Sequence, residues 1–407
     1  MVKYLRFEYL FIFMVIVWDP FQRYILKVDG GANTIALLAI TVLFISFRKK
    51  IFHKLIFTKP IFLWFIWILY SFLNTIIVGY SSDLPISSFF LNISIPLLLM
   101  LVICMEFIRN EDRVINVIIS GLYIAVILTL FFAIETFEGR IGGAMNSNTI
   151  GIMSTVLCML IYYKTYKRQI KISQFAVLII VPLFAIISTG SRTAFDGVLL
   201  LFALHFFLNR SRYILFTLLK IVLGALFLFL PFNYILENTG LGERIMSTTK
   251  QSEGMTFETG NEMLDKFGDR GFFYYRGWEV FKEHPITGIG LENFKNYNHL
   301  ELAQHSEYMI QLTELGLIGF ILFILFYASI FKNLKIIKKV YNDSFQKREI
   351  ELFISYLLII LLMITATRMY RVWFLFVIVG IVVGYIHKER LNSVLKNEEL
   401  MVIKENE

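Results

Sequence analysis

Three residues stand out as candidates for group-transfer chemistry: Arg192, Arg276 and His305. The planar fork of N–H donors on arginine stays charged and matches the oxygens of an anionic group. A histidine imidazole has a usual pKa of about 6.5, so near neutral pH it can take a proton from a sugar hydroxyl. The sequence therefore offers groups for binding an anion and for accepting a proton.

Arg192 lies in the segment Ser188–Asp196, among small hydroxyl residues between two apolar runs. On a helix, Arg192 and Asp196 are four residues apart and would pair. Alternatively, an arginine beside helix-start amides is suited to binding an anion. We favour the anion site, because a charge at a membrane boundary is costly unless it has a role or a partner.

A second polar segment runs from Arg140 to Asn148 and contains the pair Gly142-Gly143. The two glycines permit a tight turn, and Asn148 is placed to cap the helix that follows. In the functional alternative, Arg140 and Asn148 face a polar substrate.

Aromatic residues mark a third segment, Asp269–Pro285. Trp278 and Phe281 are three residues apart, which is consistent with a short helix at the membrane interface, where Trp and Tyr prefer to lie. Pro285 is expected to end this helix, and Gly288 and Gly290 to open a turn. A scaffold role for the aromatic residues competes with direct substrate contact by Trp278.

His305 belongs to a fourth segment, which leads from Glu301 to Glu314. If this segment is helical, Glu301 lies one turn before His305 and orients its ring. Together with Arg270 and Arg276 of the third segment, Glu301 and Glu314 complete the predicted polar site.

The composition identifies an integral membrane protein. Of the 407 residues, 57% are hydrophobic and only 17% are charged, whereas a soluble domain carries about 25% charged residues. The mean hydropathy is +0.67. A water-soluble globule of this size cannot bury so much apolar surface.

About twelve apolar runs are long enough to cross a bilayer, for which about 20 residues suffice. We predict an all-α fold with these spans: Tyr4–Trp18, Gly31–Phe47, Ile61–Val78, Phe89–Phe107, Val114–Ile134, Thr149–Tyr163, Ile172–Ile187, Ala194–Leu208, Tyr213–Leu230, Leu315–Phe331, Ile350–Ala366 and Val372–Ile386.

Lysine and arginine cluster on alternate connections, such as Arg48–Lys59, Lys164–Lys171 and Lys332–Arg348. The positive-inside rule then places both termini in the cytoplasm. The long connection between the ninth and tenth spans falls outside, and its glycine and aromatic residues predict a folded loop. The predicted domains are the first nine spans, the extracytoplasmic loop with short helices, and the last three spans with a cytoplasmic tail: residues 1–236, 237–314 and 315–407.

Several classes of protein are excluded. Cys104 and Cys158 both fall inside apolar runs, so no disulfide framework is expected. There is no Walker glycine loop and no metal-binding motif, so we expect neither a nucleotide substrate nor a metal. The net charge of +8 is explained by membrane-flanking lysine and arginine, and nucleic acid is not an expected partner.

In this order, the outer-face segments resemble the O-antigen ligase and O-antigen polymerase superfamily of bacterial membrane glycosyltransferases. The matching pieces are Arg140-Ile-Gly-Gly with Asn148, Ser191-Arg192-Thr-Ala, Arg276-Gly-Trp278 through His284-Pro285-Ile-Thr-Gly288-Ile-Gly290, and His305-Ser-Glu-Tyr-Met-Ile-Gln-Leu-Thr-Glu314-Leu-Gly316-Leu-Ile-Gly319.

The resemblance implies a multi-pass protein of the bacterial cytoplasmic membrane that transfers a glycan from a polyprenyl-pyrophosphate donor without a metal or other cofactor. It implies that Arg192 and Arg276 hold the pyrophosphate and that His305 activates the acceptor hydroxyl. The implied partners are the lipid-linked oligosaccharide, a glycan acceptor, membrane lipid, a flippase and a chain-length regulator.

Three activities stay open. Polymerases and ligases share this donor and differ in the acceptor. A composition rich in Lys, Ile, Asn and Phe suggests a low-GC genome, which favours a polymerase of capsule or exopolysaccharide over a ligase to lipopolysaccharide. A transporter or flippase fits the span count equally well, but few charged residues lie mid-membrane to form an ion pathway.

Overall fold

The computed structural model describes residues 6–26, 40–43, 46, 49–80, 86–132, 134–135, 141–142, 145–208, 269–298, 303–369 and 372–405. Their helices and strands are α1 Phe7–Phe21, the π-helix η1 Gln22–Leu26, α3 Lys50–Ile56, α4 Lys59–Val78, α5 Ile86–Arg109, α6 Glu111–Phe132, β1 Ile134–Glu135, β2 Ile141–Gly142, α7 Ser147–Tyr166, α8 Ile172–Thr189, α9 Arg192–Leu208, α13 Asp269–Glu283, the 3₁₀ helix η2 Phe294–Tyr297, α14 Glu307–Thr313, α15 Gly316–Val340, α16 Ser344–Met363 and α17 Phe374–Glu405.

The described residues form an all-helical membrane protein, apart from the two-residue strands β1 and β2, which pair antiparallel. By length and composition, 6 candidate membrane spans are present in these residues: Phe7–Leu26, Lys59–Val78, Phe89–Arg109, Glu111–Phe132, Ile172–Thr189 and Gly316–Val340. The integral membrane class is confirmed. The total of about twelve spans and their orientation stay predictions.

Every predicted span that falls within the described ranges corresponds to a helix. Tyr213–Leu230 lies outside the described residues, as does most of Gly31–Phe47. Helices often continue beyond their apolar run: α15 continues to Val340 and α17 to Glu405. Hydropathy marks only the part of a helix that lipid would surround, whereas lysine, glutamate and leucine sustain a helix in water as well.

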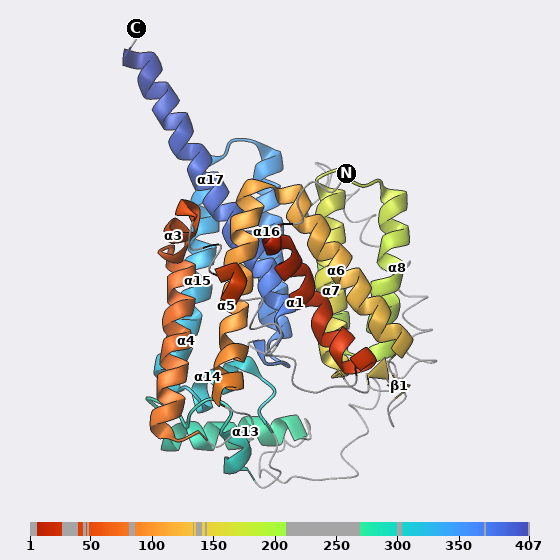
Figure 1. Ribbon diagram of the computed structural model, residues 1–407, viewed down its shortest axis with the longest axis vertical. Helices are drawn as coiled ribbons and strands as arrows, with labels where there is room; N and C mark the ends of the chain where they lie inside the picture. Colours follow the sequence, from red (N-terminus) through yellow and green to blue (C-terminus); the bar gives the residue numbers. More distant parts are fainter. Residues whose placement is uncertain are drawn as a thin grey trace.

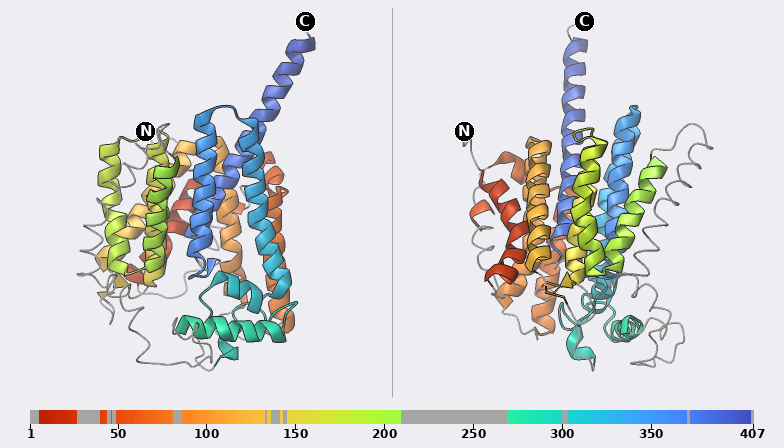
Figure 2. Two further views of the ribbon diagram at one scale, coloured as in Figure 1. Left: turned by 180° about the vertical axis from the view of Figure 1, so that it is seen from behind. Right: turned by 90° about the vertical axis from the view of Figure 1, so that its right-hand side faces the viewer.

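The long helices lie side by side in one bundle, and α13 lies across one end of it (Figures 1 and 2). The C-terminal part of α17 projects from the opposite end (Figure 1). Helix α7 packs against α6, α8, α9 and α17, and most of its residues are buried. The predicted cytoplasmic connections gather at the end from which α17 projects, away from α13.

Close packing of α17 on α5 depends on small residues. Cβ atoms added at Gly380 and Gly384 would lie 3.1 Å from Ile103 Cβ and 3.0 Å from Phe107 Cβ. Glycine therefore lets the two helices approach at these points, as is common between membrane helices. Cys104 and Cys158 are free and buried, as their apolar surroundings predict.

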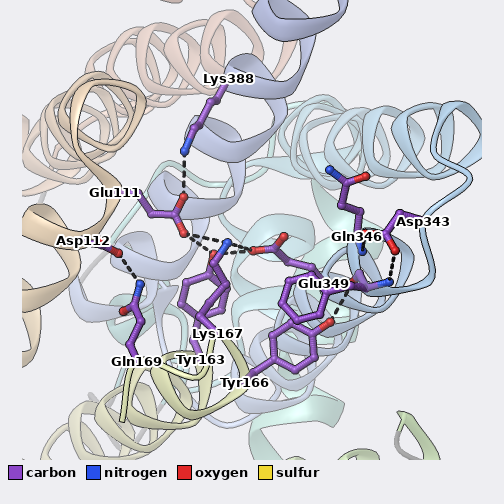
Figure 3. Close-up of polar contacts among 11 residues, drawn as sticks. Glu111, Asp112, Tyr163, Tyr166, Lys167, Gln169, Asp343, Gln346, Glu349 and Lys388 are labelled. Carbon is purple, nitrogen blue, oxygen red and sulfur yellow. Dashed lines mark hydrogen bonds and ion pairs between the residues drawn. The ribbon is translucent and has the colours of Figure 1, made fainter.

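At the end opposite α13, a cluster of charged side chains joins four helices (Figure 3). Glu111 of α6 accepts a hydrogen bond from Lys388 of α17 at 2.9 Å. Lys167, which caps α7, lies 2.8 Å from Glu349 of α16 and 3.3 Å from Glu111. The Tyr163 hydroxyl lies 2.7 Å from a carboxylate oxygen of both Glu111 and Glu349. These contacts hold the bundle together where polar groups replace its apolar core.

Substitution of Glu349 is expected to destabilise this end of the bundle. The Glu349 side chain is 4% exposed and the Lys167 side chain 23%, so E349Q leaves a partly buried ammonium with a weaker partner. The expected loss is about 3 kcal/mol in the free energy of unfolding, measured by thermal unfolding of the purified protein in detergent. In K167M/E349Q the loss should be smaller than the sum of the single losses.

The pair Lys338–Glu351 provides a matched control. Its atoms are 2.7 Å apart, but the side chains are 37% and 36% exposed, and solvent screens such pairs. E351Q should change stability little. If E349Q were as stable as E351Q, solvent would screen the Lys167–Glu349 pair as strongly as the exposed pair, and the prediction would be wrong.

Candidate functional site

The described part of the segment predicted to lie outside the membrane, residues 269–298 and 303–314, forms a cap on one end of the bundle (Figure 1). The predicted helix around Trp278 is confirmed as α13, which ends at Glu283, before Pro285. Its inner face packs into a small apolar core that is separate from the core of the bundle and contains Phe273, Val280, Ile289 and Phe294. This core gives the cap a fixed shape on which polar groups can be held.

The predicted turn after α13 is also confirmed and requires glycine. Gly288 has φ +71° and Gly316 φ +64°. A Cβ atom on Gly288 would lie 2.4 Å from the carbonyl carbon of Glu314, and one on Gly316 would lie 2.3 Å from the carbonyl oxygen of Ile286. The two backbone segments therefore touch, and the turn is locked onto the first residues of α15.

Side chains at the end of α4 fix the position of the same turn. The Asn74 amide donates to Thr287 O at 2.9 Å, and Leu291 N donates to the Thr75 hydroxyl at 2.8 Å. These bonds satisfy backbone groups of a loop that has little regular structure of its own. The cap is thus anchored to the bundle from both α4 and α15.

Arg276 projects from α13 beside η2. Its Nε donates to Tyr297 O at 2.7 Å, and its Nη1 donates to Glu279 Oε2 at 3.1 Å. A guanidinium carries five N–H donors, and these two bonds leave its Nη2 group for a further acceptor. The arginine is therefore oriented by the cap while keeping donors that suit a phosphate.

His305 lies in the non-helical residues just before α14 and is exposed. Its backbone N–H donates to Gln304 Oε1 at 3.0 Å. Its ring meets the ring of Phe273 edge to face, with centroids 6.1 Å apart. Since Phe273 and Arg276 are three residues apart on α13, the same helix carries Arg276 and a ring that packs against His305.

Residues 303–306 are not helical, which corrects the helical segment assumed for His305. Glu301 itself lies outside the described residues, and its orienting role stays a prediction. The structure shows instead that Gln304 bonds the His305 backbone. Sequence spacing could not find this contact, because it depends on an extended chain.

Two buried carboxyl groups, Glu307 and Glu314, lie in and beside α14. Burial raises the pKa of Glu307 to about 7 and that of Glu314 to about 8. Glu307 Oε2 accepts from Met369 N at 2.6 Å, and Glu314 Oε2 accepts from Glu292 N at 2.8 Å. In the structure both groups hold backbone amides of neighbouring loops. Binding of substrate by Glu314 stays a prediction.

Arg192 is the first residue of α9 and belongs to another part of the same end of the bundle. It follows Ser191, whose side chain packs tightly on α7: a Cβ atom on Gly151 would lie 2.7 Å from Ser191 Cβ. Arg192 interacts electrostatically with Asp196, as the four-residue spacing predicts. Arg192 also lies beside the backbone amides of the first turn of α9. An anion site at this helix start stays a prediction.

The cap of α7 is Asn146 and not Asn148, which corrects the predicted capping residue. The side chain of Asn146 accepts a hydrogen bond from Asn148 N at 2.8 Å, because an N-cap side chain reaches the amide two residues ahead. Arg140 lies outside the described residues, and so does the side chain of Arg270, whose backbone is in the first turn of α13.

Trp278 is 48% exposed on α13 and lies against Phe281, with ring centroids 5.2 Å apart. Tyr274, one turn earlier, is partly exposed and donates to Thr365 O at 3.1 Å. The exposed aromatic flank therefore adjoins the connection between α16 and α17. Both a scaffold role and contact with substrate are compatible with this position.

The structure thus brings Arg276, His305 and Glu314 together in one cap and places Arg192 and Asn148 at the ends of α9 and α7. Sequence reasoning missed Gln304, Glu292 and Arg368, which support the cap from inside. No motif or spacing in the sequence singled out these three residues.

Residues 174–324 match the model of the O-antigen ligase family. The matched segment runs from α8 into α15 and includes Arg192, Arg276 and His305. The resemblance suggested by the motifs is confirmed over these residues. Over these residues the chain is similar to the O-antigen ligase and polymerase family of membrane enzymes, which transfer glycans. No curated protein matches the chain.

Proposed function

We propose that the protein polymerises oligosaccharide repeat units linked to polyprenyl pyrophosphate, on the outer face of the bacterial cytoplasmic membrane. The observation that carries this proposal is the family segment at residues 174–324, which contains an oriented arginine and an exposed histidine on one cap. The products are capsule, exopolysaccharide or O-antigen chains.

In this proposal the arginines bind the pyrophosphate and the histidine accepts the proton of the acceptor hydroxyl. The donor loses a diphosphate, which needs only neutralisation of its developing charge, and guanidinium groups supply this without giving up a proton. Arg276 keeps Nη donors for that purpose, and Arg192 has helix-start amides beside it. No metal is needed for this step.

The transfer is a single inverting displacement. The acceptor hydroxyl oxygen forms a bond to the anomeric carbon while the bond from that carbon to the pyrophosphate oxygen breaks. The hydroxyl proton moves to the His305 imidazole, and polyprenyl pyrophosphate leaves with the electron pair. His305 then returns its proton to solvent, which its exposed position allows.

The alternative within the family is a ligase that transfers the same glycan to a lipid, wall or protein acceptor. The low-GC type of composition favours the polymerase. A transporter is disfavoured because the family segment belongs to enzymes.

Deletion of the gene in its native host separates the two enzymes. A strain without the polymerase should keep a single repeat unit on the carrier lipid or the surface, whereas a strain without a ligase accumulates long polymer on the carrier. The measurement is the ladder of surface and lipid-linked glycan on a gel. Long polymer on the carrier would reject the polymerase in favour of the ligase.

A further inference from the structure

We propose that Arg368, in the connection between α16 and α17, is a positioning residue that holds His305 for catalysis through Gln304. This inference rests on the proposed function, because it assumes that His305 is the base. Arg368 is 64 residues away from Gln304 in the sequence, and no sequence motif connects the two.

Gln304 is the direct support of His305. It is 2% exposed, and its side-chain Nε2 donates to Phe273 O at 3.0 Å while its Oε1 accepts from His305 N at 3.0 Å. Each end of the amide has one partner of the matching kind, so the orientation of the amide is determined. Gln304 therefore ties the backbone of His305 to α13, whose Phe273 ring also meets the imidazole.

Arg368 fixes the backbone of Gln304. Its Nε donates to Gln304 O at 2.7 Å, and its Nη1 donates to Glu292 Oε2 at 3.1 Å. The side chains of Arg368 and Glu292 are only 11% and 7% exposed, so solvent screens this ion pair weakly. One planar guanidinium thus joins the residue before His305 to the turn that follows α13.

Glu292 is held in an unfavourable conformation to make this contact. Its φ is +72°, in the left-handed region that is unfavourable for a residue with a side chain. Its backbone N–H donates to the buried Glu314 at 2.8 Å, which keeps it there. Such strain persists only where the surroundings determine it, and here the result is a carboxylate that faces Arg368.

The same connection also grips the residues after His305. Glu307 N donates to Ile364 O at 2.9 Å, and Met369 N donates to Glu307 Oε2 at 2.6 Å. The chain is therefore bound at Gln304 and at Glu307, on both sides of His305. The histidine therefore has a fixed backbone and an exposed side chain. A base that must meet a mobile lipid-linked acceptor requires both.

The test is the rate at which purified full-length protein in detergent extends a lipid-linked repeat unit. We expect R368Q to lower kcat by about a hundredfold, the loss that a misplaced catalytic group causes, with the KM for the repeat unit unchanged within about twofold. R368K keeps a charge opposite Glu292 but cannot make both bonds with a planar fork, and it should be equally slow.

Two further variants make the outcome decisive. R390Q removes an arginine at the other end of the bundle, where its Nη2 donates to Asn333 Oδ1 at 2.7 Å, and should keep full activity. If R368Q does not fold, Q304M decides: it preserves side-chain length and removes both amide contacts, so its kcat should fall in the same way.

A normal rate in R368K would overturn the positioning role, because charge balance for Glu292 would then be enough. A normal rate in a folded R368Q or in Q304M would overturn it as well. H305A separates the two proposals. An active H305A variant rejects His305 as the base, whereas an inactive H305A beside a fully active R368Q rejects only the role of Arg368.

Discussion

Replacement of His305 by alanine is expected to abolish polymer formation while leaving the protein folded. The imidazole accepts the proton of the attacking hydroxyl, and loss of a general base typically costs a factor of about 10²–10⁴ in rate. The exposed ring packs edge to face on Phe273, and Gln304 holds the backbone of His305, so removal of the imidazole should leave the cap folded. The measurement is the length distribution of surface polysaccharide in a complemented deletion strain, together with extension of repeat units by the purified protein.

His284 offers a control that is matched in type and surroundings. It also lies in the cap, is exposed, and meets the ring of Tyr297 edge to face with centroids 6.1 Å apart. H284A should give a normal ladder. If H305A and H284A both gave full-length polymer, neither imidazole would be the base, and the proposed displacement would be wrong.

The helical bundle could be predicted from sequence because each span is a local signal. Long apolar runs have one stable arrangement in lipid, the helix, since all backbone hydrogen bonds are then satisfied. Ile61–Val78 and Phe89–Phe107 were predicted within a few residues of α4 and α5. The ends were less accurate, as in α15, where the helix continues through basic residues to Val340.

The candidate site was predictable only in part, and the reason is the distance along the chain. Arg276 and His305 could be selected because their types suit the chemistry and their segment carries a family motif. Arg368 could not, since its partners Gln304 and Glu292 are brought to it by the packing of the cap against the ends of α16 and α17. An arginine in a short connection gives no periodic or motif signal.

Local capping illustrates a smaller error of the same kind. Asn146 and Asn148 both precede an apolar run, and either could begin the helix. The structure selects Asn146, which bonds the amide of Asn148. Sequence patterns locate a helix start to within a few residues, and only the geometry of the cap identifies the residue that makes the bond.

Replacement of Arg276 by alanine is the second change with a large expected effect. The guanidinium stabilises the charge that develops on the leaving pyrophosphate, and loss of such a donor typically lowers kcat by a factor of about 10²–10³. R276K keeps the charge but loses the fork that fits phosphate oxygens, and its rate should lie between those of R276A and the unaltered protein. The measurement is the rate of extension at saturating lipid-linked repeat unit.

Arg276 also supports the cap, so its catalytic effect must be separated from a structural one. Its ion pair with Glu279 is about a third exposed on both sides and should contribute little to stability, so E279A should remain active. Arg348 makes a similar Nε bond to a backbone carbonyl, Ser344 O at 3.2 Å, at the opposite end of the bundle, and R348A controls for loss of an arginine. A loss of rate in E279A equal to that in R276A would assign the effect to the fold of the cap, because E279A leaves every donor of Arg276 in place for the pyrophosphate.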